Sequence, residues 1–118
     1  MSEEHTHLNV ISDMQGFKGA VMGAKKDGKK CLLQWSASFC MPCKAIKDDL
    51  KGFADKYADK MVMHYVDCEA EDMEELQEMY EISSMPSFTM LDGPGAAKAK
   101  YEGQIPAKIE EFIVSALE

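Results

Sequence analysis

Short apolar runs alternate along the chain with segments whose apolar residues recur every three or four positions. A short apolar run between polar residues predicts a buried strand, and an apolar stripe with helical spacing predicts an amphipathic helix. On this basis the sequence predicts strands at residues 7–11, 31–35, 61–66, 87–91 and 97–101.

The predicted helices fill the intervals between these strands and end the chain. The clearest apolar stripe follows Cys43, where Ile46, Leu50, Phe53 and Tyr57 share one face and the other face carries lysines and aspartates. Pro106 suits the first turn of the last helix, because its missing N–H would have no partner there. The remaining helices are predicted at residues 14–27, 73–80 and 106–117.

The order of these elements predicts the topology. Strands that alternate with helices pair in parallel, whereas two strands joined by the turn-rich residues 92–95 form an antiparallel hairpin. We therefore expect one α/β domain over residues 7–118, built on a mixed five-stranded sheet with helices on both faces. Residues 1–6 are polar and are predicted to form a flexible N-terminal tail.

The strongest chemical signal is a pair of cysteines where a predicted strand gives way to a helix, Cys40-Met41-Pro42-Cys43. Residues i and i+3 of a helical turn lie about 5–6 Å apart, which is within the distance that a disulfide spans. Cys40 would lie at the helix N-terminus, where free N–H groups lower a thiol pKa below its ordinary value of about 8.5. We predict that Cys40 attacks a substrate disulfide and that the more buried Cys43 resolves the mixed disulfide.

Four segments in sequence order resemble the thioredoxin family: Trp35–Lys44, Tyr65–Asp67, Ile82–Phe88 and Tyr101–Gly103. The resemblance covers about residues 8–117 and implies a thioredoxin fold, with a central mixed five-stranded sheet and about four helices on its two faces. It also implies that the Met85–Pro86 bond is cis and packs against the cysteine pair. The backbone of Met85 would then pair with an extended substrate segment, as in strand addition.

The resemblance implies an apolar docking surface for client proteins around the cysteine pair. Flexible methionines suit such a surface, because their polarizable side chains adapt to varied partners. The residues expected to bind substrate are Phe39, Met41, Pro42, Met85, Pro86 and Gly103.

The sequence departs from the family pattern at several positions. Met41 stands where glycine is usual, Phe39 where tryptophan is usual, and Asp48 where a proline usually kinks the helix. Gln34 occupies the position of the buried acid expected beneath the cysteine pair, and Tyr65 stands where lysine or glutamate is frequent. We expect these changes to alter the redox potential and the route of proton transfer, while both cysteines are retained.

Composition and charge restrict the partners. The chain has 118 residues, of which 46% are hydrophobic and 29% charged, and its net charge of −8 argues against nucleic acid or an anionic membrane as a partner. The polar, acidic residues 1–10 do not resemble a secretory signal, so we expect a cytoplasmic location. In that reducing compartment a C-x-x-C motif is more often catalytic or metal-binding than structural.

Two alternatives concern the side chains around the cysteine pair. Zinc would need further ligands, for which Cys31, Cys68 and His64 are the candidates. Cys31 opens one predicted strand and Cys68 follows the end of the next, so in parallel strands they would lie too far apart for one metal or one disulfide.

The acidic residues 67–78 are expected to form a solvated face, or alternatively to steer basic partners toward the protein.

The function predicted is a thiol–disulfide oxidoreductase that reduces protein disulfides through Cys40 and Cys43. No bound cofactor or metal is needed, because the two cysteines carry the electrons. The partners would be disulfide-containing client proteins and an external reductant such as a thioredoxin reductase. The alternative is a non-catalytic binding module that uses the surface around Cys40 and Pro86.

Overall fold

A computed structural model of the protein describes residues 9–93 and 99–118. The predicted tail and the start of the first predicted strand lie outside these residues, as does the beginning of the last predicted strand. The described strands form one five-stranded sheet in the order β1-β3-β2-β4-β5. Their bounds are β1 Asn9–Ile11, β2 Lys30–Ser36, β3 Met61–Asp67, β4 Ser87–Leu91 and β5 Ala99–Glu102.

The strand directions agree with the prediction from element order. β1 and β2 each pair in parallel with β3, whereas β4 runs antiparallel to β2 and β5 runs antiparallel to β4. The carboxyl ends of β2 and β3 therefore meet the amino end of β4 at one edge of the sheet. The predicted architecture, a mixed five-stranded sheet with helices on both faces, is confirmed.

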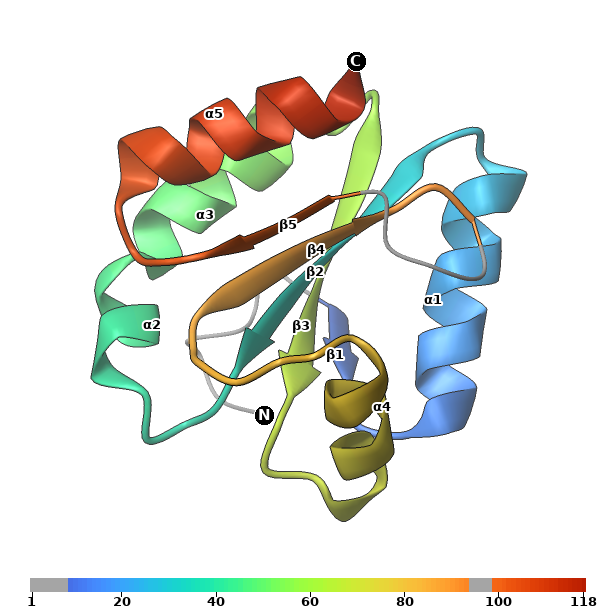
Figure 1. The fold of residues 1–118 in the computed structure, drawn as a ribbon. Helices are drawn as coiled ribbons and strands as arrows, with labels where there is room; N and C mark the ends of the chain where they lie inside the picture. The colour runs from blue at the N-terminus through green and yellow to red at the C-terminus, as the bar shows by residue number, and fades with distance from the viewer. Residues whose placement is uncertain (1–8, 94–98) are drawn as a thin grey trace.

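Helices cover both faces of the sheet, with α3 and α5 on one side and α1 and α4 on the other (Figure 1). The first helix begins where Asp13 caps it, because the carboxylate accepts a hydrogen bond from the Gly16 N–H at 2.6 Å. The bounds are α1 Met14–Lys26, α2 Met41–Ala45, α3 Lys47–Lys56, the 3₁₀ turn η2 Glu71–Met73, α4 Glu74–Met79 and α5 Pro106–Leu117.

The single helix predicted after Cys43 is wrong in one respect, because the chain breaks it into α2 and α3 at Ile46. Ile46 has φ −105° and ψ 5°, and its carbonyl accepts the first hydrogen bond of α3 from the Leu50 N–H at 2.9 Å. Asp48 and Asp49 lie in the first turn of α3, where carboxylates interact favourably with the helix dipole. These two carboxylates favour the start of α3 at this point, although Asp48 stands where the family usually has a proline.

The sheet divides the apolar interior into two clusters. Leu32 faces α3 and α5, while its neighbours Leu33 and Trp35 face α1 and α4. Trp35 is fully buried, and its indole N–H donates to the Thr89 hydroxyl of the adjacent strand at 2.8 Å. Each such buried apolar side chain contributes about 1.5–3 kcal/mol. The side chains of β2 are therefore packed on both faces of the sheet, and the end of this strand sets where the following loop begins.

Candidate active site

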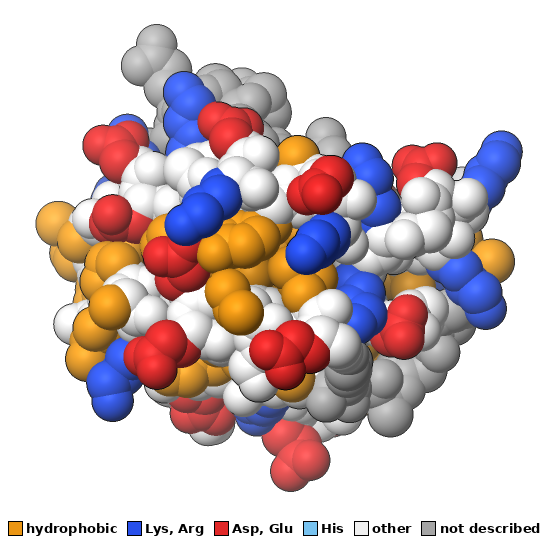
Figure 2. Space-filling view, turned by 90° about the horizontal axis from the view of Figure 1, so that it is seen from above, with side chains coloured by type: hydrophobic (Ala, Val, Ile, Leu, Met, Phe, Trp, Pro, Cys, Tyr) orange, Lys and Arg blue, Asp and Glu red, His pale blue; other side chains and the backbone are white. Residues whose placement is uncertain are grey.

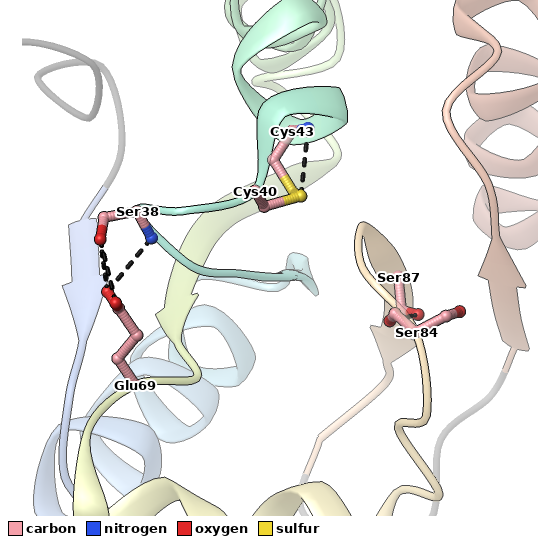
Figure 3. The surroundings of a disulfide bond; sticks show 6 residues. All are labelled: Ser38, Cys40, Cys43, Glu69, Ser84 and Ser87. Carbon is pink, nitrogen blue, oxygen red and sulfur yellow. Dashed lines mark hydrogen bonds between the residues drawn. A yellow bond between two sulfur atoms is a disulfide. The ribbon is translucent and has the colours of Figure 1, made fainter.

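The cysteine pair lies directly after β2, at the edge where the parallel strands end. The Cys40 N–H donates to the Ala37 carbonyl at 3.1 Å, which turns the chain toward α2. Cys40 and Cys43 form a disulfide with their Cα atoms 5.3 Å apart, within the range predicted from their spacing. Cys40 occupies the N-cap of α2, and its sulfur accepts a hydrogen bond from the Cys43 N–H at 3.2 Å (Figure 3).

The two cysteines are buried to the same extent in this oxidised state. Cys40 is 6% exposed and Cys43 is 5% exposed, so the expected greater burial of Cys43 is not found. The two cysteines differ in hydrogen bonding, because the Cys40 sulfur accepts a hydrogen bond from the backbone N–H of Cys43. The side chains that flank Cys40 are open to solvent, with Phe39 68% exposed and Met41 69% exposed.

The segment before β4 reaches the same edge, because Ser87 of β4 pairs with Trp35 of β2. The Met85–Pro86 peptide bond is cis, and the Pro86 carbonyl accepts a hydrogen bond from the Gly103 N–H at 3.2 Å. The Ser87 hydroxyl donates to the Ser84 carbonyl at 2.6 Å, which closes the turn. In Figure 3 this turn lies across from the disulfide.

We use "docking surface" for the six residues expected to bind substrate: Phe39, Met41, Pro42, Met85, Pro86 and Gly103. Pro42, Met85 and Gly103 are half-buried, whereas Pro86 is buried and presents little of its side chain. Gly103 has φ +150°, and a Cβ there would lie 2.5 Å from the Tyr101 hydroxyl, so the position requires glycine.

Sequence reasoning missed one apolar side chain that follows β5. Ile105 is 51% exposed although it is a large aliphatic residue, and it lies two positions after Gly103 at the start of α5. The signal that could have identified it is its place in the loop between Gly103 and Pro106, because an apolar residue outside any predicted strand or helical stripe is expected to be exposed.

A carboxylate that the sequence did not single out holds the loop before Cys40. Glu69, in the loop after β3, accepts hydrogen bonds from both the backbone N–H and the hydroxyl of Ser38, at 2.8–3.1 Å (Figure 3). These bonds lower the pKa of the Glu69 carboxyl, so it stays ionised at neutral pH. A second carboxylate, Glu102 of β5, accepts from the Ser84 hydroxyl at 3.0 Å. Each loop of the site is therefore tied to a glutamate.

Gln34 is buried within β2, with 3% of its surface exposed. It lies beside Tyr65 of β3 and Phe88 of β4, on the sheet face that α3 and α5 cover. Its Oε1 atom has no hydrogen-bond partner within residues 9–93 and 99–118. Burial raises the pKa of Tyr65 to about 12, so neither neighbour offers a base at neutral pH.

The other two cysteines do not join the site. Cys31 pairs with Val62 near the start of β2, whereas the Cys68 N–H donates to the Ser36 carbonyl beyond its end. About five residues at roughly 3.3 Å each separate these two levels of the sheet. Burial raises the pKa of both thiols to about 12. Within the described part of the chain, no group of three or more histidine, cysteine or acidic side chains could hold a metal ion.

A disulfide of this spacing, at the carboxyl end of a parallel strand and across from a cis-proline turn, defines a class of thiol–disulfide exchange proteins. The sequence profile of the thioredoxin family matches residues 9–115. The chain therefore belongs to the thioredoxin family. Of the helices in the described ranges, none has the length and apolar character that a membrane crossing requires.

Individual relatives agree with this assignment. Thioredoxin-1 of Drosophila melanogaster is 38% identical over 65 residues, an alignment that covers 55% of this chain and 59% of that protein. The crystal structure of the germline-specific thioredoxin Deadhead from the same fly has a TM-score of 0.80 and 28% identity, and the match covers 92% of this chain and 98% of that one.

A solved complex of ferredoxin:thioredoxin reductase with thioredoxin f2 contains a chain of the same fold. Its TM-score is 0.79 at 22% identity, with 94% of this chain and 96% of that chain covered.

Proposed function

We propose that this protein is a thiol–disulfide oxidoreductase that reduces disulfides in client proteins. The observation that carries the proposal is the Cys40–Cys43 disulfide at the N-terminus of α2, with solvent-exposed Phe39 and Met41 beside it. A closed pair is the oxidised half of such a cycle, and the exposed apolar side chains offer a client a surface to bury.

In the reduced protein, the Cys40 thiolate attacks one sulfur of a client disulfide, and the other client sulfur leaves as a thiolate. Cys43 then loses its proton and attacks the Cys40 sulfur of the mixed disulfide. The second client sulfur departs, the client gains two electrons and two protons, and Cys40–Cys43 is again a disulfide. The Cys43 N–H, which donates to the Cys40 sulfur in the oxidised state, would stabilise the Cys40 thiolate.

The proton of Cys43 cannot be taken by Gln34, the residue expected beneath the pair. Gln34 carries an amide, which does not act as a base near neutral pH. We propose that the departing client thiolate or solvent accepts this proton. The cycle would then work without the buried acid that the family pattern implies at this position.

An external reductant must return the disulfide to the dithiol, since the protein ends each cycle oxidised. The solved complex of ferredoxin:thioredoxin reductase with thioredoxin f2 supports a reductase as the partner class. A reducing compartment such as the cytoplasm suits this role, because the pair would remain available there as a dithiol. The docking surface would bind the client segment that carries the disulfide.

Single-cysteine variants test the proposed roles. Cys43→Ser should accumulate a mixed disulfide between Cys40 and a model protein disulfide such as insulin, while Cys40→Ser should accumulate none. Both variants should lose turnover of insulin with dithiothreitol as the reductant. A mixed disulfide trapped by Cys40→Ser would reverse the assigned roles. Binding of clients by the wild type without any turnover would support the alternative of a non-catalytic binding module.

A further inference from the structure

We infer that the docking surface selects client disulfides in positively charged segments, whose lysine or arginine residues flank the reacting cysteine. This inference rests on the proposed function and specifies its substrate class. It is carried by two anchored carboxylates, an exposed aromatic ring and the distribution of charge over the molecule.

Glu69 and Glu102 anchor the two loops that meet at the docking surface. Glu69 is held by Ser38 on the loop that leads to Cys40, and Glu102 is held by Ser84 on the turn that leads to Pro86. The pKa of each carboxyl is lowered, first by its serine hydrogen bond, so both are anionic at neutral pH. Because the serines fix their positions, both carboxylates are preorganised acceptors for a client cation.

Two lysines are close to this surface in the sequence. Lys100 forms a salt bridge with Glu102, in which its Nζ atom lies 3.3 Å from Oε1, and it also donates a hydrogen bond to the Glu81 carbonyl. Lys44 is half-buried in α2. Lys100 offsets part of the charge of Glu102, whereas Glu69 is paired with uncharged groups of Ser38 and keeps its full charge.

The exposed ring of Phe39 adds an independent preference for cations. Its side chain is 68% exposed next to Cys40, on the loop that Glu69 holds. A lysine or arginine of the client can lie over this ring, with its aliphatic stem on the apolar surface and its charge directed to a carboxylate. An acidic side chain at the same place would meet both the face of the ring and like charge.

Between the Glu69 loop and the Ser84 turn, every charged side chain is an aspartate or a glutamate. No lysine or arginine stands between Lys60 and Lys98 in the sequence. In Figure 1, α4 lies near the end of the sheet where β2 and β3 terminate. Residues of η2 and α4, together with Met14 at the start of α1, line a hollow. The acidic residues of this hollow are Glu71, Asp72, Glu74, Glu75 and Glu78.

The opposite end of the molecule, where β2 begins, carries mixed charge. Figure 2 shows lysine and acidic side chains interspersed on that face. A hollow there is lined by four lysines and two aspartates, which are Lys25, Lys29, Lys30, Lys60, Asp59 and Asp92. A negative potential concentrated around the docking surface accelerates association with cationic partners and disfavours anionic ones.

The test uses three short peptides with the same intramolecular disulfide and flanking residues of Lys, Gln or Glu. Their reduction by the wild type is followed as kcat/KM at low and at physiological salt, after correction for the rate with dithiothreitol alone. We expect the Lys peptide to exceed the Glu peptide by about tenfold at low salt, with a smaller ratio at high salt. Equal kcat/KM for the three peptides would overturn the inference and leave the proposed function intact.

A matched pair of variants locates the effect. In Glu69→Gln/Glu102→Gln each side chain keeps an acceptor for its serine but loses its charge, and the preference for the Lys peptide should fall severalfold. Asp55→Asn/Asp59→Asn removes two exposed carboxylates near the start of β3, at the opposite edge, and should keep the full preference. A loss of preference in both double variants would refute the assignment to the docking surface. No turnover of any peptide by the wild type would refute the proposed function and the inference together.

Discussion

Replacing Gln34 with aspartate would place an ionisable group at a buried position of β2, which the family resemblance puts beneath the cysteine pair. The side chain is 3% exposed, and its Oε1 atom finds no hydrogen-bond partner within the described residues. A carboxylate there would lose its hydration without gaining a donor, so its pKa should rise well above the ordinary value of about 3.9.

The magnitude follows from burial. Fully buried carboxyl groups show pKa values raised by up to about 3–5 units, and each unit corresponds to about 1.36 kcal/mol. A rise of about three units would cost the folded state about 4 kcal/mol at pH values above the raised pKa. Because the folded pKa exceeds the unfolded one, this cost is absent below about pH 4 and grows as the pH rises toward the folded pKa.

The assay is urea unfolding between pH 4 and pH 9, with Gln34→Asn as the matched control. Asparagine has the same length as aspartate and no charge, so the difference between the two variants isolates ionisation. A second readout is the thiolate absorbance of the reduced protein, which reports the pKa of Cys40. The thiols of Cys31 and Cys68 do not interfere near neutral pH, because burial holds their pKa at about 12.

We expect Gln34→Asp to lose stability with rising pH relative to Gln34→Asn, and to raise the pKa of Cys40. A buried carboxylate disfavours a second negative charge nearby, so the two titrations should be coupled. The wild type should instead show a single simple titration of Cys40. A pH-independent difference between the variants, together with an unchanged Cys40 pKa, would show that residue 34 does not lie beneath the pair.

Three further substitutions or reactions test the packing around the site. Trp35→Phe removes the donor to Thr89, whose hydroxyl is fully buried, and should cost at least about 1 kcal/mol in urea unfolding; no loss would contradict this bond. Gly103→Ala should also destabilise the protein by about 1 kcal/mol or more, because its backbone has φ +150°, and a neutral result would argue against that conformation. Cys31 and Cys68 should resist alkylation at pH 8 until the protein unfolds, and mass spectrometry of the air-oxidised monomer should find no bridge between them, whereas rapid labelling or a bridge would contradict their placement.

The central strands were predictable because burial on both faces leaves a short, nearly continuous apolar run in the sequence. β2 extends one residue beyond each end of the predicted strand 31–35, since Lys30 and Ser36 also pair with β3. The cysteine pair was predictable because residues i and i+3 of a helical turn have their Cα atoms within the range that a disulfide spans. The break at Ile46 was not predictable, because neither proline nor glycine marks it and Ile46 is itself the first residue of the apolar stripe.

The carboxylates of the site could not be predicted, because polar contacts between distant segments leave no periodic pattern. Ser38 and Glu69 are separated by 31 positions, and Ser84 and Glu102 by 18. Each partner alone reads as an ordinary solvated side chain. The burial of Pro86 was equally hidden, since it depends on how β5 and Gly103 pack against the turn.

The central claim is that Cys40 and Cys43 form a reversible redox couple, and its reduction potential tests this most directly. The protein is to be equilibrated in buffers with defined ratios of reduced to oxidised glutathione, or of reduced to oxidised dithiothreitol. The fraction of molecules with a free Cys40 thiol is then measured. We predict a reversible two-electron transition with a potential between about −270 mV, typical of a reductant, and about −120 mV, typical of an oxidant. A potential below about −300 mV, as structural disulfides have, or a pair that does not exchange, would contradict the account.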